Sequence, residues 1–194
     1  LAEVQSKIKM ATDQRSPRYG TEPVKLVAVS KRQPVVKIDA ALRAGQRVFG
    51  ENRVQEAIQR WTDRRMAYSD LTLHLIGPLQ TNKVAEAVML FDVIEVVDRE
   101  KLARALAKEM TRQNRFLPCY IQVNTGEETQ KSGILLDQLE GFTQFCRDQL
   151  ALPIIGLMCI PPVDEEAAMH FALLNRMAQR LNVPKLSMGM SGDY

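Results

Sequence analysis

Lys31 ends a short run of apolar residues, VAVSK (27–31). Small and β-branched residues predict a buried strand, so the lysine lies where that strand ends. A lysine in this position can be partly desolvated, which leaves more neutral amine to attack a carbonyl and form a Schiff base. A solvated lysine at the start of a loop explains the same five residues, so both interpretations stay open at this point.

Amides and hydroxyls follow other apolar runs. Asn52 ends FGEN, Gln80 and Asn82 lie in IGPLQTNK, and Ser187 and Ser191 flank the Met-Gly-Met of KLSMGMSGD. Amides can orient a ligand without changing its charge, and small residues beside hydroxyls let a backbone approach an anion. The last segment therefore predicts a phosphate site. Turns and helix caps use the same residue types.

The apolar runs recur at intervals of 20 to 35 residues, with helical patterns in nearly every gap. In residues 99–113, for example, Leu102, Leu106 and Met110 share one helix face, and Asp98 can cap that helix. Alternating strands and helices predict a parallel sheet covered by helices. The spacing is close to the roughly 30 residues per unit of an eight-fold β/α barrel. The seven runs are KLVAVSK, RVFGEN, LHLIGPLQ, DVIEVVD, CYIQVN, IIGLMCI and KLSMGM.

Only seven such runs are present, and the sequence ends at SGDY, just after the seventh. An open α/β sheet also accommodates seven strands, but it would leave a long hydrophobic edge strand uncovered. We therefore expect a TIM-type (β/α)8 barrel, a single domain over residues 1–194, whose eighth strand is missing from this sequence. In both architectures the site lies at the carboxyl ends of the strands, which places Lys31 across one mouth from the serine-containing segment.

The charge pattern gives little support to binding of nucleic acid or of a membrane surface. Twenty-six Lys and Arg are interspersed with 23 Asp and Glu, for a formal charge of +3. No apolar run approaches the roughly 18 residues of a membrane span. Residues 1–14 have the pattern of an amphipathic helix rather than a signal peptide. We expect a cytoplasmic protein.

The residue types that bind metals or form disulfides are few. The three cysteines are widely spaced and suit reduced core thiols of a cytosolic protein. The only histidines, His74 and His170, are far apart in the sequence, and no acidic cluster with ligand spacing accompanies them. We expect no metal site.

Six blocks together resemble, in order, the pyridoxal 5'-phosphate homeostasis proteins of the YggS/PROSC type. The resemblance runs from about Val24 to Tyr194. It implies a single-domain barrel related to the N-terminal domain of alanine racemase. It also implies that Lys31, the match to the family's lysine after the first strand, holds pyridoxal 5'-phosphate as an internal aldimine. The blocks are KLVAVSK, FGENRVQEA, HLIGPLQTNK, VN followed by EETQKSG, GLMCIPP and LSMGMSGD.

The resemblance also implies roles for other residues. Ser191, with Ser187 nearby, would contact the cofactor phosphate, while Asn52 and Met158 would lie near the ring. Lys131 in TQKSG matches a lysine associated with cofactor exchange, although a solvated loop lysine explains it equally well. Members of the family continue with a helix, a Gly-Ser/Thr phosphate loop and a VRIG-type eighth strand, none of which this sequence contains.

The expected function is to bind pyridoxal phosphate and to buffer or deliver it, with little or no turnover. A racemase of this fold needs a second acid/base, a tyrosine from an additional domain, and no tyrosine here matches it. PLP-dependent apo-enzymes are the expected recipients, and a monomer the expected state. One alternative is a racemase- or decarboxylase-type enzyme acting on an amino acid. Another is a class I aldolase-type barrel, which is disfavoured because no acids flank VAVSK.

Overall fold

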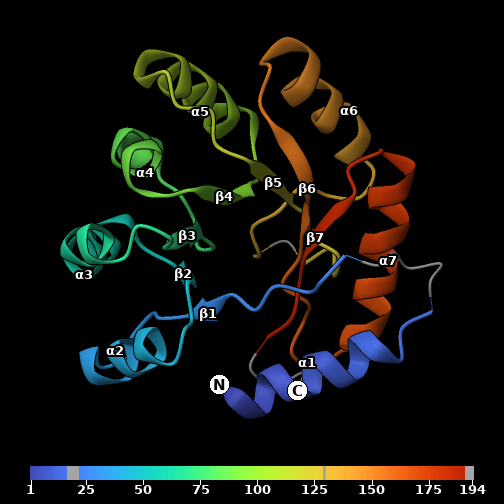
Figure 1. The fold of residues 1–194 in the computed structure, drawn as a ribbon. Helices are drawn as coiled ribbons and strands as arrows, with labels where there is room; N and C mark the ends of the chain where they lie inside the picture. Colours follow the sequence, from blue (N-terminus) through green and yellow to red (C-terminus); the bar gives the residue numbers. More distant parts are fainter. Residues whose placement is uncertain (17–21, 129, 191–194) are drawn as a thin grey trace.

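The computed structural model describes residues 1–16, 22–128 and 130–190. Within these residues, seven parallel strands form one sheet whose spatial order is the order of the chain. The strands lie in an arc around a common centre (Figure 1). They are β1 (Ala28–Val29), β2 (Val48–Glu51), β3 (Thr72–Leu75), β4 (Val93–Val97), β5 (Cys119–Gln122), β6 (Ile154–Met158) and β7 (Lys185–Ser187).

Helices follow the strands and lie on the outside of the arc (Figure 1). The helix that precedes β1, Ala2–Asp13, crosses the opening between the helix that follows β1 and the helix that precedes β7 (Figure 1). A 3-10 helix, Thr81–Lys83, precedes the fourth helix, and a π-helical turn, Phe145–Gln149, extends the sixth. The helices are α1 (Ala2–Asp13), α2 (Val35–Arg43), α3 (Val54–Ala67), α4 (Val84–Leu90), α5 (Glu100–Gln113), α6 (Leu139–Gln144) and α7 (Ala167–Arg180).

The predicted fold class is confirmed: all seven runs form strands of a parallel β/α barrel, and the described residues contain no eighth strand. The strands at the two edges of the described sheet are short, since β1 has two residues and β7 has three. β7 begins directly after Pro184, which has no N–H to donate to a ladder. Its first residue, Lys185, is exposed, and its ammonium lies 3.4 Å from the carboxylate of Glu22. Short, charged edges discourage pairing with another chain.

Helix α5 shows how the sequence pattern translates into packing. Leu102, Leu106 and Met110 are fully buried, as their spacing predicts. The predicted cap is wrong, because Arg99 occupies the N-cap position and no side chain caps the helix. The Asp98 carboxylate instead pairs with the guanidinium of Arg99.

The two faces of the sheet differ in polarity. On β3, Leu73 and Leu75 are fully buried and contribute to the core, while His74 alternates with them. Alternate residues of a strand point to opposite faces. Ser187 of β7 bonds Glu95 of β4, and because these strands are not neighbours, the bond must cross the concave face. Polar side chains therefore meet inside the barrel, whereas Leu73 and Leu75 pack into the apolar core.

The cysteine prediction is confirmed: Cys119, Cys146 and Cys159 are buried thiols outside any disulfide. Burial raises the pKa of the Cys146 thiol to about 12 and also raises that of Cys119. Both thiols therefore stay protonated at neutral pH.

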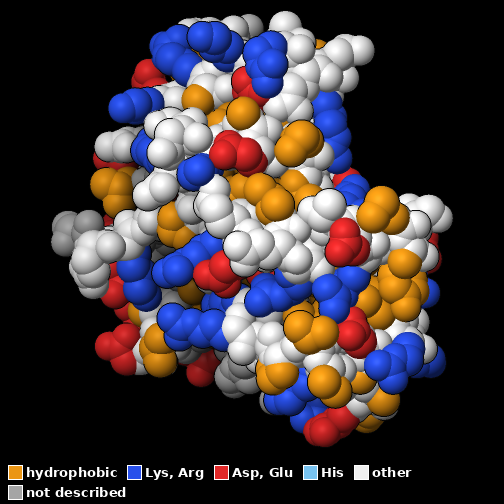
Figure 2. Space-filling view, turned by 90° about the vertical axis from the view of Figure 1, so that its left-hand side faces the viewer, with side chains coloured by type: hydrophobic (Ala, Val, Ile, Leu, Met, Phe, Trp, Pro, Cys, Tyr) orange, Lys and Arg blue, Asp and Glu red, His pale blue; other side chains and the backbone are white. Residues whose placement is uncertain are grey.

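Charged residues of both signs are mixed over the face shown in Figure 2, with apolar side chains scattered among them. Helix α3 contributes to this pattern through the pairing of Arg64 with Asp39 and of Arg65 with Asp92, at 2.8 and 2.7 Å. In the described part of the chain, no helix combines the length and apolar character needed to cross a membrane.

Candidate functional site

Lys31 follows β1 directly and occupies a tight turn. The carbonyl oxygen of Ser30 accepts a hydrogen bond from the backbone N–H of Gln33, at 3.1 Å, which closes the turn around Lys31 and Arg32. Arg32 has a φ of 57°, in the left-handed region that residues with a side chain rarely adopt. Backbone strain of this kind is found at ligand sites more often than elsewhere.

The structure leaves Lys31 exposed, which agrees with the solvated one of the two interpretations that the sequence left open. The physical reason is its place at the edge of the sheet. In the described residues β2 is the only strand paired with β1, so no strand covers the other side of the lysine. An exposed amine is accessible to a ligand in solution.

Asn52 follows β2 and lies at the same end of the sheet as Lys31. Its side-chain Oδ1 is buried, and among the described residues nothing donates a hydrogen bond to it. Gly77, after β3, packs so closely that a Cβ there would lie 2.5 Å from the Asn52 backbone oxygen. Buried polar atoms are normally paired, so the bare oxygen marks a place where a ligand donor would fit.

Met158 and Ser187 end β6 and β7 and are register partners. Met158 is buried and Ser187 is half-buried. The Ser187 hydroxyl donates a hydrogen bond of 2.5 Å to Oε2 of Glu95. The backbone then reaches Gly189, whose φ is 105° and where an added Cβ would meet no atom of the described residues within 4 Å. The segment after β7 thus leaves open space, as a phosphate site requires. Ser191 lies outside the described residues.

Sequence reasoning missed a polar chain inside the barrel. Oε1 of Glu95 lies 2.5 Å from Nδ1 of His74, so this one buried carboxylate joins β3, β4 and β7. Burial and the Glu95 charge raise the pKa of Tyr120, on β5, to about 12. The sequence did contain a signal for this polar chain, because Glu95 interrupts the apolar run DVIEVVD. A carboxylate buried within a strand nearly always has a hydrogen-bonding partner.

Three other predicted positions do not join this arrangement. Gln80 and Asn82 are exposed. Lys131 pairs with Glu128 on its own loop, at 2.5 Å between Nζ and Oε2. The loop is held by Asn124, whose amide donates to the Glu128 carbonyl oxygen at 2.8 Å.

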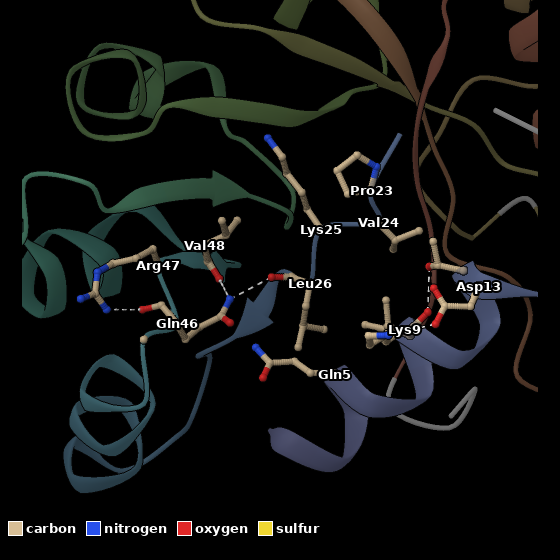
Figure 3. Close-up of a pocket in the computed structure, with 13 residues that line it drawn as sticks. Gln5, Lys9, Asp13, Pro23, Val24, Lys25, Leu26, Gln46, Arg47 and Val48 are labelled. Carbon is tan, nitrogen blue, oxygen red and sulfur yellow. Dashed lines mark hydrogen bonds and ion pairs between the residues drawn. The ribbon is translucent and has the colours of Figure 1, made fainter. Parts of the chain in front are cut away.

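A cavity of about 500 Å³ lies between α1 and the residues that lead into β1 and β2 (Figure 3). It is lined by none of the predicted site residues. Gln46 in its wall donates to the carbonyl oxygens of Leu26 and Val48, at 2.8 and 2.6 Å. Lys9 pairs with Asp13 at 3.0 Å. Because these polar groups satisfy one another, we place the functional site at the other end of the strands.

Within the described ranges, no three His, Cys, Asp or Glu side chains lie together as metal ligands would. The predicted site residues at the carboxyl ends of the strands instead include an amine at Lys31, an amide at Asn52 and a hydroxyl at Ser187. They suit an organic ligand that carries a carbonyl and a phosphate.

Comparison with known proteins shows the family of this chain. The family model for the alanine racemase N-terminal domain matches residues 13–194. A protein of Pasteurella multocida (strain Pm70) named pyridoxal phosphate homeostasis protein is 35% identical over 203 residues, covering 100% of this chain and 86% of the relative. The chain belongs to the pyridoxal phosphate homeostasis proteins, within the alanine racemase N-terminal domain family.

Solved structures agree with this family. PipY from Synechococcus elongatus PCC7942, solved with PLP bound, superposes with a TM-score of 0.76 at 34% identity, covering 98% of this chain and 90% of PipY. An alanine racemase from Corynebacterium glutamicum shares the fold at 19% identity, with a TM-score of 0.61 over 93% of this chain and 52% of the enzyme.

The residues of this family member fit pyridoxal phosphate. The exposed amine of Lys31 could react with the aldehyde, and the Oδ1 of Asn52, which accepts no hydrogen bond from the described residues, could accept one from the ligand. The open space around Gly189 can admit an anion.

Proposed function

We propose that this chain binds pyridoxal 5'-phosphate through Lys31 and holds it for buffering or delivery, with little or no turnover. Nζ of Lys31 attacks the aldehyde carbon, a carbon–nitrogen double bond forms, and the carbonyl oxygen leaves as water. The observation that carries the proposal is the exposed amine of Lys31 at the same end of the sheet as the unpartnered Oδ1 of Asn52.

The resemblance to the family supplies the remaining contacts. Asn52 and Met158 would lie near the ring, and Ser187, together with Ser191, would contact the phosphate. The Ser187 hydroxyl has one proton, which it donates to Glu95. To contact the phosphate, it must either donate that proton to a phosphate oxygen instead or accept a hydrogen bond from a protonated phosphate.

Holding rather than turnover is supported by the tyrosines. A racemase needs a second acid/base facing the lysine across the substrate. Tyr68 lies at the end of α3 beneath the Arg47 guanidinium, 4.9 Å from its ring centroid, and Tyr120 lies in the barrel interior with a raised pKa. Both lie toward the amino ends of the strands, whereas Lys31 follows the carboxyl end of β1. Tyr19 and Tyr194 lie outside the described residues. The recipients would be PLP-dependent apo-enzymes, with this chain acting as a monomer.

The test is trapping of the cofactor. The chain is mixed with pyridoxal phosphate, reduced with borohydride and mapped by peptide mass spectrometry. We expect one adduct, on Lys31, which Lys31→Ala abolishes. Lys25→Ala is the matched control, because Lys25 is also exposed but precedes β1 at the opposite end. An adduct spread over surface lysines, or unchanged in Lys31→Ala, would contradict the proposal. Exchange of an amino acid's α-proton by the loaded protein would favour the racemase-type alternative.

A further inference from the structure

Glu51, the last residue of β2, is a fully buried carboxylate that the proposed function does not use. One of its oxygens, Oε1, accepts three hydrogen bonds: from the Ser30 hydroxyl at 2.6 Å, from Arg60 at 2.6 Å and from the indole N–H of Trp61 at 2.9 Å. Among the described residues, nothing donates to Oε2. Burying a charge is costly, and the ion pair with Arg60 offsets part of that cost.

The bond from Ser30 connects this carboxylate to the lysine turn. Ser30 is buried and immediately precedes Lys31. Its backbone N–H donates to the carbonyl oxygen of Gly50 at 3.0 Å. Its hydroxyl can reach that same oxygen at 3.2 Å, but the bond to the Glu51 carboxylate is shorter and charge-assisted, and therefore stronger.

Few other contacts hold the turn. β1 has only two residues and pairs with β2 alone among the described strands. On the far side of Lys31, Arg32 has a left-handed φ of 57°, a strained conformation that persists only when its surroundings impose it. The hydrogen bond from Ser30 to Glu51 meets that requirement, because Arg60 and Trp61 of α3 hold the Glu51 carboxylate in place.

We propose that Glu51 is a positioning residue for Lys31: held by α3, it fixes Ser30 and so aims the lysine at the carbonyl it captures. The inference rests on the proposed function of Lys31. It predicts that loss of the bond between Ser30 and Glu51 impairs Lys31 beyond what the loss of stability explains.

The experiment compares Ser30→Ala and Glu51→Gln with Asp39→Asn. The Asp39 carboxylate accepts two hydrogen bonds from Arg64, at 2.8 and 3.0 Å. Arg64 lies in α3, the helix that also holds Glu51, but these bonds do not involve Ser30 or Glu51. Three quantities are measured: stability to urea, hydrogen exchange of residues 28–33 in the ligand-free protein, and the rate at which borohydride traps pyridoxal phosphate on Lys31.

We expect Ser30→Ala to exchange faster over residues 28–33 and to trap cofactor on Lys31 roughly tenfold more slowly, as loss of one charge-assisted hydrogen bond would allow. The trapping rate of Glu51→Gln should lie between those of Ser30→Ala and the wild type, because the amide oxygen of the glutamine still accepts a hydrogen bond from Ser30. Ser30→Thr, which keeps the hydroxyl, should restore trapping. Asp39→Asn should lose stability while leaving trapping unchanged.

Two failures can be told apart. If the wild type traps no cofactor on Lys31, the proposed function is wrong, and hydrogen exchange still tests the anchor. If the wild type traps cofactor but Ser30→Ala behaves like Asp39→Asn in exchange and trapping, the positioning role is overturned. If Glu51→Gln does not fold, Ser30→Ala alone decides.

Discussion

Gly77 offers a sharp test of how the site is built. Replacing it with alanine would place a Cβ 2.5 Å from the backbone oxygen of Asn52 and 2.6 Å from its Cα. Ordinary contacts begin near 3.4 Å, so the two segments must separate by about 0.9 Å. They are tied together beside this point, because the N–H of Ile76 donates to the carbonyl oxygen of Glu51 at 2.9 Å. The strain falls on Asn52 and on the end of β2.

The expected magnitude follows from two opposing effects. Overpacking of this kind costs about 1–3 kcal/mol. Alanine also restricts the unfolded chain, which returns about 0.4–1 kcal/mol where the native backbone tolerates it. Gly77 has no left-handed φ, so no further backbone penalty applies. We expect Gly77→Ala to lose about 1–2 kcal/mol of unfolding free energy and to weaken cofactor trapping on Lys31, because Asn52 moves.

Urea unfolding followed by the fluorescence of the single tryptophan, Trp61, measures the change. Gly141→Ala is the matched control: Gly141 lies in α6, and an added Cβ there meets nothing within 4 Å. It should gain about 0.5–1 kcal/mol, the usual preference of a helix for alanine. If Gly77→Ala is as stable as the wild type while Gly141→Ala gains stability, the steric reasoning fails.

Two further predictions concern single groups. The raised pKa of Tyr120 means that stability is complete below pH 10, where the unfolded tyrosine ionises, and declines as pH rises toward about 12. Spectrophotometric titration should detect this late-ionising tyrosine, and Glu95→Gln should lower its pKa; an unchanged midpoint would remove Glu95 as a cause. Arg32→Gly should relieve the left-handed strain and raise stability to urea by a few tenths to about 1 kcal/mol. A loss of stability would mean that the arginine side chain contributes more than the strain costs.

Most of the fold could be predicted because the strand and helix patterns are local. The apolar runs and the four-residue spacing in α5 reflect burial, which each element expresses in its own sequence. The cap at Asp98 could not be predicted with the same assurance, because its carboxylate had a competing partner in Arg99. The sequence left the exposure of Lys31 open, because exposure depends on what packs beside β1, which a single strand does not encode.

The sequence by itself determined the β/α alternation, the strand ends that carry Lys31, Asn52 and Ser187, and the resemblance to a cofactor-binding family. Only the tertiary structure decided which buried polar groups meet. Glu95 and Ser187 are 92 positions apart, and Glu51 and Ser30 are 21 apart. Such pairs form because curvature and register of the sheet bring distant residues together, and a buried carboxylate is stable only where donors converge on it. A local sequence pattern indicates that a residue is buried. Which residue it contacts depends on how the strands are arranged in the folded protein.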